Sequence, residues 1–364
     1  MTSRERMKGI LTRTSYDHYG ITEHFWGETL NDEWPKQGYR KDADPHDVFG
    51  YDLRGIAGSP DPTPFRGVNE VIEETDEWQV TRSGWGSALK NWKHHSGTPE
   101  HIDFTIKTPA DWKPYRDQIA DVTDPTRIDF EGIRKTYNER MAQDKFCVFG
   151  QVLTFELMRH ALGDVTMLES FILEPAWVHD MCRVLTDFYI RHMELIFRDV
   201  GKPDGMFIYE DLGFRNGLFA SPKTLRELIF PYYRQYVDFL HGHDLPVILH
   251  SCGGVTEAVP DLVDIGFDCL QPMEAKAGVN VVQLAEKFGD RIAFMGNIDV
   301  TKLNTNDRAV VKEEVLGKLS RLYDLGARYV FHSDHSIPPD IKYDTYRYAV
   351  DLYREFAATH PCGG

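Results

Sequence analysis

Short apolar runs alternate with amphipathic segments from about residue 146 to the end of the chain. The runs are rich in Val, Ile, Leu and Phe, which is typical of strands buried on both faces of a sheet. We therefore predict a series of buried strands in this part of the chain. They cover residues 146–152, 205–209, 246–250, 268–272, 291–297 and 328–332.

Apolar residues at helical spacing fill the intervals between these runs. In the longest such segment, Pro175 suits the first helical turn and Gly201 suits the C-terminal stop. Ser221 followed by Pro222 is a typical helix start. Strands that are regularly followed by crossover helices predict a parallel sheet. The predicted helices cover residues 111–120, 130–142, 175–200, 221–240, 281–288, 307–325 and 343–356.

The first third of the chain adds two candidate strands, at residues 23–27 and 47–53. With them the strand count reaches eight, which favours a closed (β/α)8 TIM barrel of the α/β class over an open sheet. In such a barrel the catalytic face lies at the C-terminal ends of the strands. We expect residues 1–364 to form this single barrel domain.

Residues 71–104 interrupt the strand–helix rhythm. Two alternating polar and apolar runs flank a glycine-containing turn at residues 83–86, which predicts an antiparallel β-hairpin, and a polar loop follows it. Trp78, Trp85 and Trp92 recur at regular intervals in this segment. We predict that this N-terminal insertion lies near the barrel mouth and shapes the substrate pocket.

Composition and charge narrow the classes of function. The chain has 364 residues, of which 41% are hydrophobic and 27% charged, so it can bury a large core. Its formal net charge of −16 argues against nucleic acid or an anionic membrane as a general partner. No predicted strand is followed by a glycine-rich phosphate loop, which argues against nucleotide-dependent chemistry.

Cysteine usage and hydropathy indicate the compartment. The five cysteines are odd in number and widely spaced, so they do not suggest a disulfide framework. The first residues lack the apolar core of a signal peptide, and no apolar run approaches the length of a membrane span. We therefore expect a cytoplasmic protein that is not embedded in a membrane.

The strand predicted at residues 246–250 changes character abruptly at its end. His250 and Cys252 are two residues apart, so their side chains point the same way on an extended chain, and Gly253 and Gly254 then turn it. An imidazole beside a thiol is a metal-ligand arrangement for which zinc is the first expectation. The alternative is a structural pair, because buried cysteines and strand-capping histidines are common.

Reactive polar residues also follow the other predicted strands. If the strands form a barrel, their C-terminal ends meet on one face, where such side chains surround a common pocket. A ring of carboxylates, imidazoles and one thiol indicates a functional site. Its members are Glu210, Asp211, His250, Cys252, Gln271, Glu274, Asn297, Asp299, His332, Asp334 and His335.

Residues 250–253, 294–299 and 331–339 resemble the uroporphyrinogen decarboxylase superfamily. Residues 92–104 and 209–217 look like its decarboxylase-like, uncharacterised and demethylase-associated members. The resemblance covers most of the chain and implies a (β/α)8 barrel with its pocket at the strand ends. This superfamily holds decarboxylases and also zinc-dependent methyltransferases that work with a corrinoid.

In those methyltransferases a His-x-Cys pair and a later cysteine hold the zinc. His250 and Cys252 match the pair, and His335 occupies the later position. The resemblance implies zinc bound by His250, Cys252 and His335, with Glu210 as the fourth ligand and Asp211 as its alternate. The expected catalytic residues are Glu210, Asp211 and His335. The residues expected to bind substrate or cofactor are Gln271, Glu274, Asn297, Asp299, His332 and Asp334.

The decarboxylases of the superfamily hold their substrate's carboxylates with an arginine- and glycine-rich loop, which this chain lacks, and have a histidine at the position of His335. The resemblance favours a methyltransferase that exchanges a methyl group between a small substrate or thiol and a corrinoid such as methylcobalamin. The expected partners are a small-molecule methyl donor or acceptor and a corrinoid protein, and a homodimer is compatible with the chain. The alternatives are a decarboxylase of a tetrapyrrole or other polycarboxylate and a non-catalytic corrinoid- or tetrapyrrole-binding protein.

Overall fold

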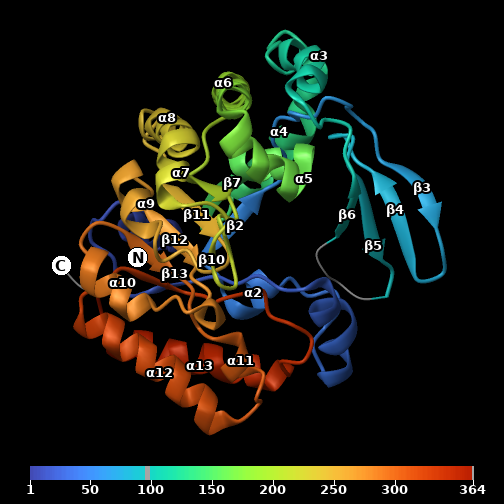
Figure 1. Ribbon diagram of the computed structural model, residues 1–364. Coiled ribbons are helices and arrows are strands. Elements are labelled where there is room, and N and C mark those ends of the chain that lie inside the picture. The colour runs from blue at the N-terminus through green and yellow to red at the C-terminus, as the bar shows by residue number, and fades with distance from the viewer. Residues whose placement is uncertain (95–98, 363–364) are drawn as a thin grey trace.

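Eight parallel strands form the central sheet of the computed structural model, which describes residues 1–94 and 99–362 (Figure 1). Their spatial order is β1-β14-β13-β12-β11-β8-β7-β2, so the first strand lies beside the last. This order is that of a (β/α)8 barrel, and it confirms the predicted α/β fold. The strands are β1 (Gly20–Ile21), β2 (Leu53–Ile56), β7 (Phe146–Val152), β8 (Gly205–Tyr209), β11 (Val247–Ser251), β12 (Cys269–Pro272), β13 (Ala293–Met295) and β14 (Tyr329–Phe331).

Asp52 joins the two ends of the sheet, between β1 and β2. Its backbone N–H donates to the Ile21 carbonyl at 2.8 Å. Its carboxylate accepts hydrogen bonds from the Ile21 N–H at 2.9 Å and from the Arg6 guanidinium at 2.8 Å. Arg6 belongs to α1 (Ser3–Leu11), which packs its apolar side against the barrel interior. Asp52 therefore links barrel closure to the helix that covers the interior.

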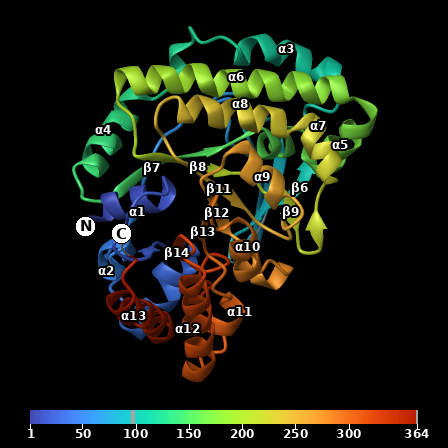
Figure 2. The ribbon, with the colours of Figure 1, turned by 90° about the vertical axis from the view of Figure 1, so that its left-hand side faces the viewer.

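Helices surround the barrel, and their apolar sides pack against the strands to form the main hydrophobic core (Figures 1 and 2). In the described ranges, no helix is both long enough and apolar enough to cross a membrane. The helices of this layer are α4 (Phe130–Met141), α5 (Thr154–Leu173), α6 (Pro175–Asp199), α7 (Pro222–Leu228), α8 (Phe230–His241), α9 (Val259–Ile265), α10 (Val281–Phe288), α11 (Val300–Leu303), α12 (Arg308–Asp324) and α13 (Tyr343–Thr359).

The insertion forms a four-stranded antiparallel sheet beside the barrel, not only the predicted hairpin (Figure 1). The predicted hairpin is its central pair, in which Trp78 lies opposite Trp92. The first strand of the sheet shows no alternation of apolar and polar residues, because all its side chains are exposed and none packs on a core. Residues 95–98 of the predicted insertion lie outside the described residues. The strands are β3 (Glu70–Glu74), β4 (Trp78–Arg82), β5 (Ala88–Trp92) and β6 (Glu100–Asp103).

The two strands predicted in the first third are misplaced. Residues 23–27 follow β1 and form no strand of their own. Residues 47–49 of the segment predicted at 47–53 lie in α2 (Pro45–Phe49), because the Asp44 side chain caps this helix and Gly50, with a φ of 64°, ends it. Only the last predicted residue, Leu53, lies in a strand, at the start of β2. The count of eight barrel strands still holds, since β1 and β2 lie only a few residues from the predicted ranges.

Residues 221–240 form two helices, α7 and α8, instead of one. Pro231, which has no N–H to continue the helical hydrogen bonds, lies in the first turn of α8. The helix predicted at residues 111–120 is confirmed as α3 (Pro109–Ile119). The remaining short elements are η1 (Thr29–Glu33), η2 (Pro35–Gln37), η3 (Pro125–Arg127), η4 (Ala275–Ala277), β9 (Gly213–Phe214) and β10 (Gly217–Leu218).

We expect Asp52→Ala to lower the free energy of unfolding by about 3 kcal/mol, because it removes a buried partner of the Arg6 guanidinium. Denaturant unfolding measures this change. The matched control is Asp42→Ala, since Asp42 pairs with Arg40 on the surface, where both side chains are more than 70% exposed, at 76% and 77%. The control should leave the unfolding midpoint unchanged, and equal shifts for the two variants would contradict the role given to Asp52.

Candidate metal centre

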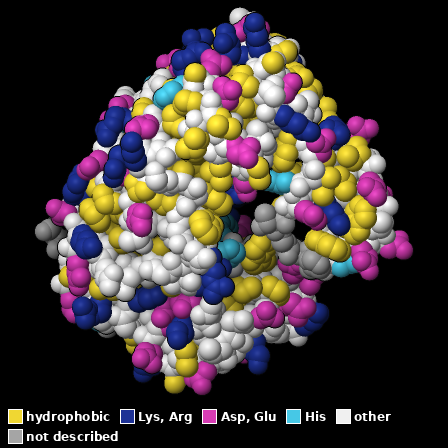
Figure 3. Space-filling view, in the orientation of Figure 1, with side chains coloured by type: hydrophobic (Ala, Val, Ile, Leu, Met, Phe, Trp, Pro, Cys, Tyr) yellow, Lys and Arg dark blue, Asp and Glu magenta, His cyan; other side chains and the backbone are white. Residues whose placement is uncertain are grey.

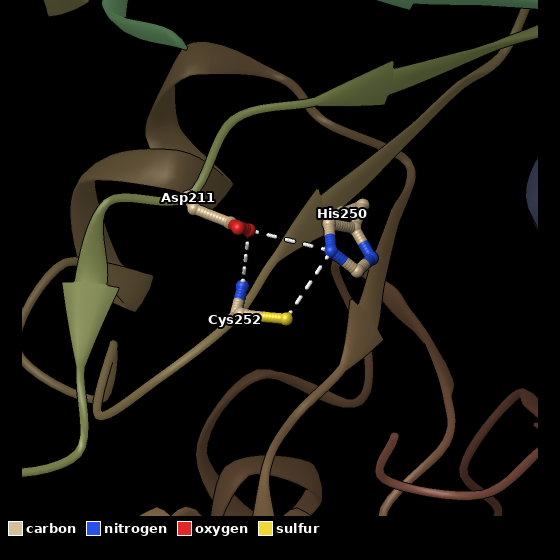
Figure 4. A group of neighbouring side chains, drawn as sticks. All are labelled: Asp211, His250 and Cys252. Atoms are coloured by element: carbon tan, nitrogen blue, oxygen red, sulfur yellow. Dashed lines mark hydrogen bonds and ion pairs between the residues drawn. The ribbon is translucent and has the colours of Figure 1, made fainter. Parts of the chain in front are cut away.

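Asp211, His250 and Cys252 form a compact group of metal-ligand side chains at the ends of β8 and β11 (Figure 4). The His250 Nε2 atom lies 3.3 Å from Cys252 Sγ and 3.3 Å from Asp211 Oδ1. One ligand atom of each residue lies within 4.8 Å of the others, and no other such group occurs among the described residues. The three side chains therefore face a common point.

Local backbone geometry explains how the group assembles. His250 and Cys252 lie on one side of an extended segment, as their spacing predicts. Gly253 then adopts a φ of 82°, and a Cβ atom there would come within 2.4 Å of the Gly213 backbone. Only glycine permits this close approach. The approach brings the chain after β8 alongside, and the Cys252 N–H donates to Asp211 Oδ1 at 2.9 Å.

Gln271 on β12 fixes the orientation of the His250 ring. It lies opposite His250 in the sheet register, and its Oε1 atom lies 2.5 Å from His250 Nδ1. An amide oxygen only accepts, so the Nδ1 atom carries the proton. The His250 Nε2 lone pair then faces Cys252 and Asp211, which is the arrangement of a metal-binding histidine.

Behind Gln271 lies a buried row of polar side chains, in which His332 was predicted at a strand end and His24 was not predicted. Gln271 Nε2 lies 3.3 Å from His332 Nε2, and His332 Nε2 lies 3.2 Å from His24 Nδ1. Burial lowers the pKa of His332 well below its usual value and that of His24 to about 4, and it raises the pKa of Glu23 to about 8. At neutral pH this row therefore adds no positive imidazole to the site.

The charges around Cys252 favour a cation. Burial raises the pKa of the Cys252 thiol, and the nearby Asp211 and Glu274 carboxylates raise it further. Burial also raises the pKa of Asp211, but His250 and the Cys252 N–H outweigh this and the net shift is downward. Cys252 and Glu274 line a cavity of about 470 Å³ together with Arg215 and Lys276. A metal ion at this point would stabilise the thiolate.

Glu210, predicted as the fourth metal ligand, is not part of the group. Its buried carboxylate accepts hydrogen bonds from the backbone N–H groups of Leu153 at 2.7 Å, Phe155 at 2.8 Å and Glu156 at 3.3 Å, and from the Tyr233 hydroxyl. Successive residues of an extended chain point to opposite sides, so Glu210 faces the start of α5 while the next residue faces the site. Asp211, the predicted alternate, is the carboxylate that lies within the group.

His335, predicted as the third ligand, also lies outside the group. Its ring stacks on Trp26 with the ring centroids 5.8 Å apart. It lies beyond the end of β14, where the position of a side chain depends on the loop rather than on the strand register. The ligand set supported by the geometry is therefore Asp211, His250 and Cys252.

The other residues predicted to bind substrate divide into two kinds. Gln271 and His332 lie behind His250, and Glu274 lines the cavity beside Cys252. The remaining three hold loops together. Asn297 donates to the carbonyls of Met273 and Val279, Asp299 caps α11, and Asp334 accepts from the N–H groups of Ala275 and Val300.

Glu23 and His24 were missed as members of the site. Both fall in a segment predicted as a strand, where adjacent polar residues would point to opposite faces. The chain instead leaves β1 before Glu23, and the Glu23 carboxylate accepts from the Ser333 N–H at 3.0 Å. The only signal in the sequence was an acidic residue next to a histidine, directly before the apolar residues Phe25 and Trp26.

Comparison with known proteins places the chain in a family. The family model described as uroporphyrinogen decarboxylase (URO-D) matches residues 106–356, and the chain belongs to this family. The uroporphyrinogen decarboxylase of Aquifex aeolicus is 27% identical over 133 residues, which cover 36% of this chain and 37% of that protein. That of Chloroherpeton thalassium is 27% identical over 139 residues, covering 37% and 38%.

A similar solved structure extends over the whole chain. A methyltransferase from Methanosarcina mazei aligns with 98% of this chain and 99% of its own, with a TM-score of 0.63 and 16% sequence identity. At this identity the likeness establishes the barrel fold alone. The matches to the curated decarboxylases span little more than a third of those proteins, at 37% and 38%.

We expect Glu210→Gln to lower the free energy of unfolding by about 2 kcal/mol, because an amide nitrogen cannot accept the hydrogen bonds at the start of α5. If the group of Asp211, His250 and Cys252 holds zinc, as the sequence resemblance implies, the zinc content of the variant should equal that of the wild type. Denaturant unfolding and metal analysis measure the two effects, with the exposed Glu257→Gln as the matched control. Loss of zinc without loss of stability would restore Glu210 as a ligand.

If His250 is a zinc ligand, as the sequence resemblance implies, replacing Gln271 with Leu should weaken zinc binding by about ten- to a hundredfold, because the His250 ring loses the acceptor that fixes its tautomer. Competition with a coloured chelator gives the dissociation constant. Gln283→Leu, at an exposed glutamine of α10, is the matched control and should bind zinc like the wild type. An unchanged dissociation constant for Gln271→Leu would contradict this role.

Proposed function

We propose that this chain is a zinc-dependent methyltransferase that exchanges a methyl group between a small substrate or thiol and a corrinoid. The observation that carries the proposal is the group formed by Asp211, His250 and Cys252 at the strand-end face. A decarboxylase has no need of a thiol beside an oriented imidazole, whereas a zinc site does. The full-length likeness to a methyltransferase fold is compatible with it.

The donor set fits zinc. It offers one imidazole nitrogen, one thiol sulfur and one carboxylate oxygen, all of which are zinc ligands, whereas magnesium and calcium prefer oxygen alone. Catalytic zinc sites use three protein ligands and keep one position for a reacting group. When bound there, zinc would lower the pKa of a coordinated thiol or hydroxyl and make it a stronger nucleophile.

The chain's own residues prepare this position. Gln271 holds the His250 ring with its Nε2 lone pair toward the group, and Asp211 fixes the turn at Cys252 by accepting its N–H. Lys276 and Arg215 line the neighbouring cavity, where they can pair with a negative charge on an incoming molecule.

The corrinoid belongs to the proposal as a carrier on a partner protein. The sequence resemblance suggests it, because members of the methyltransferase branch receive the corrinoid from a separate protein. The candidate centre lies at the strand-end face of the barrel, where such a partner can approach. The role of the chain's own residues is to hold and orient the small molecule that gives or accepts the methyl group.

A decarboxylase acting on a polycarboxylate is the second candidate. The family match and the names of the curated relatives favour it. Arg215 and Lys276 beside Cys252 could pair with substrate carboxylates. Two basic side chains are too few to pair with all the carboxylates of a polycarboxylate substrate. For this reason we place the decarboxylase behind the methyltransferase.

We expect the zinc-loaded chain to demethylate methylcobalamin in the presence of a small thiol. Cys252→Ala should lose bound zinc and reduce this activity to background, because it removes the only sulfur donor of the group. The visible spectrum of the corrinoid follows the reaction, and metal analysis gives the zinc content. Cys362→Ala, at a half-buried cysteine near the end of the described chain, is the matched control and should keep both.

The wild type and the Cys252→Ala variant also distinguish a decarboxylase from a methyltransferase. Release of carbon dioxide from a porphyrinogen by both the wild type and the zinc-free Cys252→Ala variant would support a metal-free decarboxylase. It would contradict the methyltransferase proposal if methylcobalamin were left intact at the same time.

A further inference from the structure

A second cavity, of about 550 Å³, opens on the strand-end face and differs in composition from the one beside Cys252. It lies at the C-terminal ends of β2, β7 and β8, and Trp85 from the inserted sheet forms part of its wall. The surface is hollowed between the barrel and this sheet (Figure 3). The volume is within the range of small-molecule sites.

Tyr209 connects this cavity with the candidate metal centre. Its ring lines the cavity, and the ring centroid lies 5.4 Å from that of His250. The two residues lie opposite each other on adjacent strands. A molecule in the cavity would therefore lie against the strand pair that carries the centre.

The cavity carries no charge. Among the described residues, none that lines it is acidic or basic, whereas Arg215, Glu274 and Lys276 line the cavity beside Cys252. An ionised molecule would lose its hydration there without gaining a counter-charge, which costs free energy. The lining thus selects a neutral ligand over a polycarboxylate or a quaternary ammonium ion.

The shape of the lining favours a flat ring. Aromatic side chains of Trp85, Tyr189 and Tyr209 contribute to the wall, and aromatic faces pack well on aromatic ligands. Two glycines of the lining place no side chain in the cavity, which leaves room for a ligand. A Cβ atom at Gly55 would meet nothing within 4 Å, and one at Gly150 would lie 3.3 Å from the Tyr209 ring.

Hydrogen-bond donors without a partner line the cavity, so they favour a ligand that carries a hydrogen-bond acceptor. The buried Gln151 amide accepts from the Tyr236 hydroxyl at 2.8 Å through its oxygen, but its nitrogen has no partner. The hydroxyls of Tyr189 and Tyr209 also have no hydrogen-bond partner in the described part of the chain. These groups can donate to an oxygen acceptor, which a purely apolar ligand or a simple ammonium ion does not offer.

We propose that this cavity binds the organic substrate of the neighbouring centre and that this substrate is a neutral, flat aromatic molecule with an ether or hydroxyl oxygen. The identity of the bound molecule as a substrate rests on the function proposed above. Its chemical class rests on the uncharged aromatic lining and the free donors. Trp85 gives the inserted sheet a direct part in selecting it.

Calorimetric titration of the zinc-loaded full chain with guaiacol (2-methoxyphenol) tests the proposal. The wild type should bind guaiacol, and Gly55→Val should weaken binding by roughly tenfold or more. The new side chain meets no protein atom at its Cβ and so fills the cavity while leaving the fold and the zinc content unchanged. Gly317→Val on α12, where a Cβ also meets nothing within 4 Å, is the matched control and should bind guaiacol like the wild type.

Tetramethylammonium and benzoate serve as charged probes of similar size. Either of them binding more tightly than guaiacol would overturn the proposal, and so would equal guaiacol binding by Gly55→Val and the wild type. Guaiacol binding that Gly55→Val removes would support the cavity's assignment even if no methylcobalamin were turned over, which would contradict only the proposed function. Methylcobalamin turnover without any guaiacol binding would instead overturn the assignment and leave the proposed function intact.

Discussion

The hydrogen-bonded register of four neighbouring strands decides where the chemistry of this protein is placed. Val152 on β7 lies opposite Tyr209 on β8, Tyr209 lies opposite His250 on β11, and His250 lies opposite Gln271 on β12. One row across the sheet thus contains the wall of the uncharged cavity, a candidate metal ligand and the amide that orients it. Because side chains alternate between the faces of a strand, a shift of one residue would separate these groups.

The strand-end face carries two electrostatic environments on either side of this row. Toward β11 and β12, acidic groups and the half-buried Cys252 thiol make a region that a cation would stabilise, with Arg215 and Lys276 at its edge. Toward β2 and β7, the lining has aromatic rings and amide or hydroxyl donors without charge. A metal-dependent reaction on a neutral organic molecule needs both kinds of surface within reach of each other.

Membership of the uroporphyrinogen decarboxylase family agrees with the barrel seen in the structure, but it does not establish the reaction. One barrel can support different chemistries, because the reaction depends on the side chains at the strand ends and on the loops. In this chain the donors offered by Asp211, His250 and Cys252 and the uncharged cavity beside them are the features that separate the candidate functions.

The strands and most helices after residue 146 followed from sequence alone, because burial on both faces and helical periodicity are local signals. The pairing of His250 with Cys252 was also predictable, since their spacing depends only on an extended backbone. The tertiary structure decided that Asp211 rather than Glu210 faces the site. It also decided that the loop after β14 holds His335 outside the group, and that Glu23 lies against Ser333 behind the site. These outcomes depend on contacts between segments distant in sequence, which no local pattern encodes.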